Sequence, residues 1–315
     1  MASRSLGRSC LILGCSICIF DRFLLEGGVG KVFKALKLAD ETVGLERDET
    51  ERYAQTPVIA QERETVSPPQ DDVVTENLTR PGQWDDRLIQ ATATIGPVAE
   101  SIRALRTRIL HPSAGKTPRT LLVTSASPGE GKSFICANLG ISLAQGVDNY
   151  CLMVDCDLRR PMQHTLFGLS NKAGLADYLQ HKKKLSELLV PSGVEKLSIL
   201  QAGPRSINPA ELLGSVFMTS LVDELAKRYD DRIVLLDSPP LHAASETAIL
   251  AQHVDGVILV VRYGASRREY VKALVDAIGR DKIIGVVFNA YKSNMLDSKV
   301  FGYYEYQHNY YYSEK

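Results

Sequence analysis

The sequence lacks the features that mark secreted scaffolds, membrane-spanning chains and nucleic-acid-binding proteins. Its six cysteines, scattered over 315 residues, are too few for a disulfide scaffold. The 37 lysines and arginines are balanced by 37 aspartates and glutamates, so net charge gives no reason to expect nucleic acid as a partner. The apolar run 10–20 has 11 residues, whereas a membrane-spanning helix needs about 20. What remains is the composition of an ordinary globular chain, 44% hydrophobic. The few scattered cysteines, taken with the nucleotide site described next, favour a reducing cytoplasm.

Residues 119–133 carry the pattern of a phosphate-binding loop. A run of strand-forming residues, 121–124, breaks into a loop that contains proline and glycine. After the loop, apolar side chains recur four residues apart, which is typical of a helix; they are Ile135, Leu139 and Leu143. A strand, a glycine-rich loop and a helix in this order are the context in which a loop cradles phosphate groups.

The residue types within this loop suit a nucleotide with Mg²⁺. Gly129 and Gly131 permit a tight turn whose backbone N–H groups point inward. The helix N-terminus and Lys132 supply positive charge, and the Ser133 hydroxyl is suited to ligate Mg²⁺. One departure is Ala126, which stands where the pattern G-x-x-x-x-G-K-[ST] has its first glycine. We expect nucleotide contacts from Ser127, Pro128, Gly129, Glu130, Gly131, Lys132, Ser133 and Phe134.

Two further predicted strands end in aspartate. The run 150–155 leads into the pattern D-x-D-x-R, formed by Asp155, Asp157 and Arg159. The run 232–237 is aliphatic and ends in Asp237, which is the Walker B arrangement that reaches Mg²⁺ or its water shell. In open α/β sheets ligands bind at the carboxyl ends of the strands, so these carboxylates are expected beside the phosphate-binding loop.

Alternation of strands and helices predicts an α/β fold of the P-loop NTPase type, with a mostly parallel sheet and helices on both faces. Asn289 follows the last expected strand, where it is placed to meet the edge of a nucleotide base or to serve as a turn residue. The remaining strands are expected at 197–201, 256–261 and 283–288, and helices from Asn208, at 217–229 and at 267–278.

Composition divides the chain into four parts. Residues 1–30 are expected to be an apolar or disordered extension, for which a start codon assigned too early is one explanation. Residues 31–92 combine a short helix with a polar linker rich in glutamate, aspartate, threonine and proline. Residues 93–295 hold the nucleotide-binding domain, and residues 296–315 form a tail.

Within the domain, a helix is predicted over 100–110. Glu100, Arg103 and Arg106 fall at i, i+3 and i+6, close to one face. Ile102, Leu105 and Ile109 form another face. The charged face is either an interface or a solvated surface, and the pattern alone does not separate these two readings.

The tail is rich in tyrosine. Six of the chain's 13 tyrosines lie in its last 13 residues, with neither strand nor helix periodicity and without aliphatic partners. A packed terminal strand is one interpretation, and an exposed phosphoacceptor or docking segment is the one we favour. The candidate phosphoacceptors are Tyr303, Tyr304, Tyr306, Tyr310, Tyr311 and Tyr312.

Together these motifs resemble the bacterial tyrosine kinases of capsule and exopolysaccharide synthesis, which are P-loop proteins related to cell-division and plasmid-partition ATPases. The resemblance covers roughly residues 95–315 and rests on 126–133, 154–159, 235–239, the Glu100/Arg103/Arg106 set and the tyrosine cluster. It implies ATP and Mg²⁺ as cofactors and autophosphorylation of a neighbour's tail. The Glu100/Arg103/Arg106 set corresponds to the family's oligomerisation motif, E-x-x-R-x-x-R.

The resemblance also implies partners and a location. They are a ring of identical chains, an octamer in the family; a membrane chain-length-determinant or polysaccharide co-polymerase that activates the kinase; and a tyrosine phosphatase. The chain is then expected in the cytoplasm, held at the inner face of the membrane by a partner. The partition ATPases carry a second lysine five positions before the loop lysine, where this chain has Ser127. A kinase is therefore favoured over a partition-type ATPase switch or an ATP-binding scaffold.

The expected catalytic residues are Lys132, Asp155, Asp157 and Asp237, and the expected metal ligands are Ser133 and the same three aspartates, directly or through water. Tyrosine has a pKa of about 10 and aspartic acid about 3.9, so complete proton transfer before attack would cost roughly 8 kcal/mol. Asp155 is therefore expected to orient the tyrosine hydroxyl and to take its proton late. Most of the barrier reduction should come from the loop amides, Lys132 and Mg²⁺.

Overall fold

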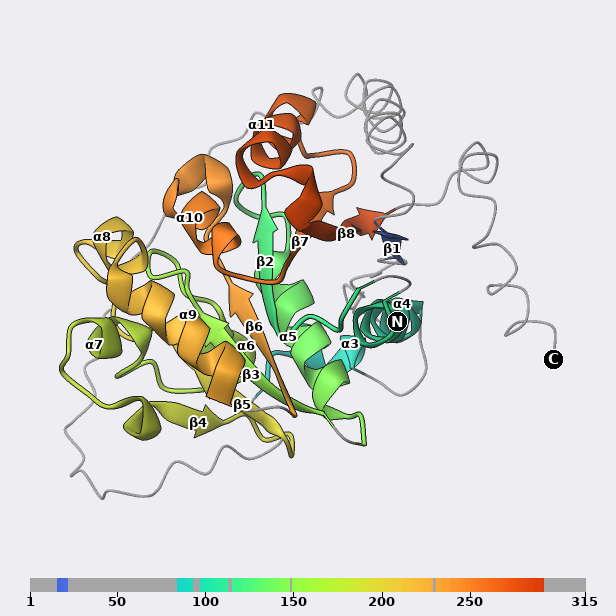
Figure 1. The fold of residues 1–315 in the computed structure, drawn as a ribbon. Helices are drawn as coiled ribbons and strands as arrows, with labels where there is room; N and C mark the ends of the chain where they lie inside the picture. Colours follow the sequence, from blue (N-terminus) through green and yellow to red (C-terminus); the bar gives the residue numbers. More distant parts are fainter. Residues whose placement is uncertain are drawn as a thin grey trace, which may run out of the picture.

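A computed structural model describes six stretches of the chain: residues 16–21, 84–92, 97–112, 115–147, 149–228 and 231–291. They contain an eight-stranded sheet in the order β1-β8-β7-β2-β6-β3-β5-β4 (Figure 1). The six strands between the edges are parallel, and the edge strands β1 and β4 are antiparallel to their neighbours. The strands are β1 (Ser16–Asp21), β2 (Thr120–Ser125), β3 (Tyr150–Asp155), β4 (Leu189–Pro191), β5 (Leu197–Leu200), β6 (Arg232–Asp237), β7 (Gly256–Arg262) and β8 (Ile283–Tyr291).

Helices cover both faces of the sheet. One face packs against α3 (Asp86–Ala91), α4 (Pro97–Leu110), α5 (Lys132–Ala144) and α6 (Gln163–Leu166). The other packs against α7 (Leu175–Leu179), α8 (Pro209–Leu213), α9 (Val216–Arg228), α10 (Glu246–Gln252) and α11 (Arg268–Ile278) (Figure 1). Short 3₁₀ turns lie at Leu185–Glu187, Leu241–Ala243 and Arg280–Lys282. This is the predicted fold class.

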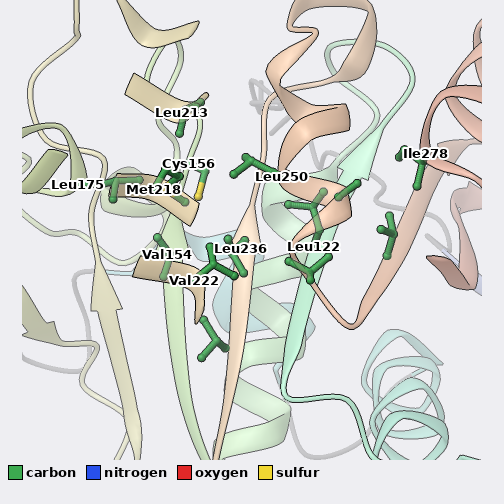
Figure 2. Close-up of a cluster of buried hydrophobic side chains, with 14 of the residues drawn as sticks. Leu122, Val154, Cys156, Leu175, Leu213, Met218, Val222, Leu236, Leu250 and Ile278 are labelled. Carbon is green, nitrogen blue, oxygen red and sulfur yellow. The ribbon is translucent and has the colours of Figure 1, made fainter. Parts of the chain in front are cut away.

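Alternating side chains of the central strands supply two apolar layers. In β2, Leu121 and Val123 join the layer under α4 and α5, whereas Leu122 joins the layer under α9 and α10. Figure 2 shows the second layer, in which Leu122 and Leu236 lie in one cluster with Val222 of α9. Strands buried on both faces read as continuous apolar runs, and such runs predicted β2, β3 and β6 from the sequence.

Within the described residues, the predicted elements are confirmed within one or two residues, with two exceptions. The helix expected over 100–110 begins earlier, at Pro97. The second exception matters for the site. The last strand was expected to end at 288, but β8 continues to Tyr291, so Asn289 lies within the strand. The sequence pattern also missed β4, which has three residues, and α10. Such short elements bury too few side chains to show a period.

Two stretches outside the predicted domain take part in the fold. Residues 16–21, inside the predicted extension, form β1 and pair with β8 from Ser16 opposite Tyr291 to Asp21 opposite Gly285. Trp84 and Leu88, inside the predicted linker, pack against the sheet layer that holds α5. Both stretches therefore pack with the sheet of the nucleotide-binding domain. The tail 296–315 lies outside the described residues, and the division into four parts stays a prediction.

Among the described residues, no helix combines the length and the apolar character needed to cross a bilayer.

Two glycines offer a matched test of packing. A Cβ on Gly174 would lie 2.1 Å from the carbonyl oxygen of Gln201 and 2.4 Å from the backbone nitrogen of Gly203, and neither backbone group can move aside cheaply. We expect Gly174→Ala to lower the free energy of unfolding by about 1–3 kcal/mol. In α5, a Cβ on Gly140 would make only ordinary contacts at 3.6 Å, so Gly140→Ala should raise it by about 0.5–1 kcal/mol. Urea unfolding of both variants measures this, and a Gly174→Ala variant as stable as Gly140→Ala would contradict it.

Candidate nucleotide and active site

The three predicted motifs meet because β2, β6 and β3 are neighbours in the sheet. Asp155 at the end of β3 is paired in register with Asp237 at the end of β6. On the other side of β6, Val123 of β2 is paired with Asp237, and the phosphate-binding loop leaves β2 two residues later. Parallel strands place their carboxyl ends at one edge, so the loop and both aspartates share that edge.

The loop has the backbone shape that a phosphate cradle requires. Gly129 and Gly131 have φ of 80° and 94°, in the left-handed region that side chains disfavour. A Cβ on Gly131 would also lie 2.0 Å from Nδ2 of Asn289, whereas one on Gly129 would meet nothing within 4 Å. The loop therefore packs tightly on one side and leaves open space at Gly129, directly before α5 begins at Lys132.

Lys132 lies among the three predicted carboxylates. Its Nζ is 2.9 Å from Oδ2 of Asp157 and 3.7 Å from Oδ1 of Asp237, and it donates to Oγ of Ser133 at 3.2 Å. Burial alone would lower the pKa of this amine, but the attraction of Asp237 and Asp157 outweighs burial and raises the pKa. The ammonium is thus charged and holds the cluster together.

The pKa values of the two strand-end aspartates are both raised. Both Asp155 and Asp237 are fully buried. Burial, together with the neighbouring Asp237 carboxyl, raises the pKa of Asp155 to about 8. Burial also raises the pKa of Asp237, although Lys132 acts to lower it. At neutral pH the pair therefore tends to share a proton that a solvent-exposed carboxyl would have lost.

This cluster fits a divalent cation. It has three carboxyl groups and one ammonium, and Oδ1 of Asp237 is buried without a hydrogen-bond donor. Among the described residues, no three acidic, histidine or cysteine side chains already form a set of metal ligands. Mg²⁺ commonly takes one or two carboxylates and completes its shell with water and substrate phosphates, so the arrangement suits Mg²⁺ bound with a nucleotide.

Comparison with known proteins agrees with this geometry. Residues 121–309 match the family described as the CobQ/CobB/MinD/ParA nucleotide binding domain. The chain is 35% identical over 208 residues to the tyrosine-protein kinase YwqD of Bacillus subtilis (strain 168), covering 65% of this chain and 86% of YwqD. The chain belongs to the bacterial tyrosine-kinase family.

Other members of this family are similar to this chain over a region of about the same length. Over 211 residues the chain is 31% identical to the tyrosine-protein kinase wzc of Salmonella typhimurium, covering 66% of this chain but only 29% of wzc. The solved kinase domain of the Escherichia coli tyrosine kinase ETK is 27% identical with a TM-score of 0.58, covering 69% of this chain and 82% of that domain. The chain thus spans less than a third of wzc but most of the solved kinase domain.

Several residues predicted to contact nucleotide have partners within the protein. The Glu130 carboxylate is buried, accepts the N–H of Ala126 at 3.0 Å and forms a short hydrogen bond with the hydroxyl of Ser266. Burial raises the pKa of Glu130, against the effect of these hydrogen bonds. The Arg262 guanidinium donates to the Gly129 carbonyl at 3.3 Å. Glu130 thus braces the loop against the β7–α11 connection.

Asn289 and Arg159 are likewise held. Nδ2 of Asn289 donates to the Glu130 carbonyl at 2.9 Å, so its amide packs under the loop. Arg159 pairs with Glu246: its Nη2 lies 2.9 Å and its Nε 3.3 Å from Oε1 of Glu246. Ser127 accepts the hydroxyl of Ser125 through its carbonyl, Pro128 is exposed and Phe134 packs on the core. The roles of these residues toward a nucleotide stay predictions.

The charged face of α4 is only partly directed outward. Glu100 and Arg103 form an ion pair one turn apart. Arg106, however, donates to the carbonyl of Ser142 at 2.9 Å, within the same chain. The apolar face of α4 is buried as predicted, through Ile102, Leu105 and Ile109. The six candidate phosphoacceptor tyrosines lie outside the described residues.

Sequence reasoning missed Gln163 and Glu246, which are both buried and both contact the site. Gln163 opens a helix of four residues, too short to show a period. Glu246 lies nine residues beyond Asp237, at the start of α10. The only local signal for Gln163 is its closeness to the D-x-D-x-R pattern.

The raised pKa of Asp155 predicts how the ligand-free protein responds to pH. The folded chain binds this proton more tightly than the unfolded chain, whose aspartate titrates near 3.8. That stabilisation is complete below the ordinary carboxyl range and is lost as the pH rises through about 8. We expect the free energy of unfolding, measured with urea, to fall between pH 6 and pH 8.5, and Asp155→Asn to make this fall smaller. Asp276→Asn, at an exposed position on α11, should keep the wild-type response. An equal fall in Asp155→Asn would contradict the assignment.

Proposed function

We propose that this chain is an ATP-dependent protein-tyrosine kinase that phosphorylates its own C-terminal tyrosine cluster, in trans between chains. The observation that carries the proposal is the convergence of Lys132 with three aspartates at the edge of the sheet that also holds the phosphate-binding loop. Membership of the tyrosine-kinase family supports the same reaction.

The site residues divide the work by their chemistry. Backbone N–H groups at Gly129–Ser133 and the N-terminus of α5 suit the phosphates of ATP. Ser133, Asp157 and Asp237 suit Mg²⁺, with Asp155 beside them. When bound, Mg²⁺ would neutralise charge on the phosphate oxygens. The Lys132 ammonium pairs with Asp157 and Asp237 in this structure. It is also suited to interact with a phosphate group of bound ATP.

Asp155 is suited to receive the proton of the attacking tyrosine. Burial raises its pKa toward that of tyrosine, so complete proton transfer would cost less than it would to an ordinary aspartate. A bound cation would lower this pKa again, so the transfer still belongs late in the reaction, when the phenol oxygen has lost its basicity.

The tail of a neighbouring chain would serve as substrate. Residues 292–315 follow β8, whose end lies beside the phosphate-binding loop through Asn289. We propose a ring of identical chains in contact through the α4 face, an octamer as in the family. A membrane polysaccharide co-polymerase would activate it at the inner face of the membrane, and a tyrosine phosphatase would reset it. Tail phosphorylation would then regulate capsule or exopolysaccharide polymerisation and export.

Loss of the Lys132 charge tests the reaction. The full chain with ATP and Mg²⁺ should gain phosphotyrosine in its last 13 residues, measured by mass spectrometry. Lys132→Met should reduce the rate at least about 100-fold, because the stabilising charge at the transferred phosphate is removed. Lys116→Met, at an exposed position before β2, should label as the wild type does.

The outcome also separates the alternatives. ATP hydrolysis and nucleotide-driven association with no phosphotyrosine would instead favour a partition-type switch. Unchanged polymer output after replacement of all six tail tyrosines by phenylalanine would favour a scaffold.

Charge reversal on α4 tests the ring. Arg103→Glu combined with Arg106→Glu should yield monomers in analytical ultracentrifugation and weaken labelling of a Lys132→Met acceptor chain. Arg106 also donates to the Ser142 carbonyl within the chain, so its reversal can destabilise the fold as well as the interface. Arg103→Glu alone should therefore weaken the assembly less than the double variant does, and it should leave the thermal midpoint of unfolding unchanged. Lys272→Glu, an exposed reversal on α11, is the control. Assemblies that persist in the double variant would show that the interface lies elsewhere.

A further inference from the structure

Gln163 is the residue that joins the three elements of the site. It is fully buried, and its Nε2 donates to Oδ2 of Asp237 at 2.8 Å and to the carbonyl of Ser133 at 3.1 Å. Its backbone N–H donates to Oδ2 of Asp155 at 3.1 Å. One residue therefore contacts the end of β3, the end of β6 and the first turn of α5.

The chemistry fixes which way the Gln163 amide points. The Ser133 carbonyl can only accept, so the amide nitrogen rather than the amide oxygen must face it. The same nitrogen then faces Oδ2 of Asp237, and the amide oxygen is left buried without a partner. Occupation of Oδ2 leaves Oδ1 of Asp237 as the oxygen that faces Lys132. Gln163 thus selects which Asp237 oxygen is available to a cation.

Gln163 depends in turn on contacts that hold α6 in place. A four-residue helix is not stable by itself. The ring of Phe167, directly after α6, is buried and meets Trp84 edge-to-face at 5.4 Å between centroids. The N–H of Asp85 donates to the Leu166 carbonyl at 2.9 Å, and Trp84 donates to the Ser192 carbonyl at 3.1 Å. The segment that precedes the nucleotide-binding domain therefore clamps α6.

We propose that Gln163 is a positioning residue, which orients Asp237 and Asp155 so that the site binds Mg²⁺ with the nucleotide. This rests on the proposed kinase function. A residue whose only role is to fill space would be replaceable by any side chain of its volume. A positioning residue needs a donor at Nε2.

The test compares two replacements of similar size in the full chain. Gln163→Met keeps the volume but removes the donor, and Gln163→His keeps a ring N–H at similar reach. Thr165→Val, at an exposed position on the same helix, is the control. Trp84 is the chain's only tryptophan and lies beside Phe167, so unchanged emission reports that α6 stays in place.

The first readout is independent of catalysis. The dissociation constant of a fluorescent ATP analogue is measured with Mg²⁺ and with EDTA. We expect Gln163→Met to reduce the tightening by Mg²⁺ about 10-fold or more, because loss of a group that orients metal ligands typically costs 10–100-fold. Gln163→His should stay within about 3-fold of the wild type. In EDTA all variants should bind alike.

The second readout is the phosphotyrosine rate. Gln163→Met should lower kcat about 10- to 100-fold, with a smaller change in KM for ATP, and Gln163→His should restore most of kcat. Equal loss in both variants, or no loss in Gln163→Met, would overturn the positioning role. Absence of labelling in the wild type would reject the kinase instead, while the Mg²⁺ readout would still decide the role of Gln163.

Discussion

The structure depends on the ion cluster formed by the Lys132 ammonium and the carboxyl groups of Asp157, Asp237 and Asp155. In the interior, a lone carboxylate pair would be costly, and the ammonium 2.9 Å from Asp157 offsets part of that cost. One ammonium cannot neutralise three carboxylates, and burial together with the neighbouring Asp237 carboxyl raises the pKa of Asp155. The site has excess negative charge next to the phosphate-binding loop, so it suits a cation that contacts both the carboxylates and the phosphates of a nucleotide.

Other residues at this edge of the sheet hold the phosphate-binding loop and the aspartates in place. Glu130 and Ser266 join the phosphate-binding loop to the β7–α11 connection, and Asn289 holds the same loop from β8. Gln163 holds the aspartates from the opposite side. The loop is therefore fixed by strands on one side and the carboxylates by a clamped helix on the other. Such fixed dipoles and charges act without reorganisation when charge develops in a reaction.

The two groups of contacts also show how the site is connected to the rest of the chain. β8, which holds Asn289, leads directly to the tyrosine-rich tail. α6, which holds Gln163, is packed against the segment that leads into the domain from its N-terminal side. The site thus has one physical connection to the segment that would be modified and another to residues 84–92, on the N-terminal side of the phosphate-binding loop.

The fold class could be predicted, and the residues of the candidate site could be singled out, because their signals are local. Continuous apolar runs specify buried parallel strands, and Gly131-Lys132-Ser133 or an aspartate after such a run is visible in a few residues. Tertiary structure alone decided that Asn289 and Glu130 brace the loop, that Arg159 meets Glu246 and that Arg106 contacts α5. It also decided which groups Gln163 and Trp84 contact. These residues act through partners up to 159 positions away in the chain, and no local pattern encodes a contact whose two halves meet only when the sheet has formed.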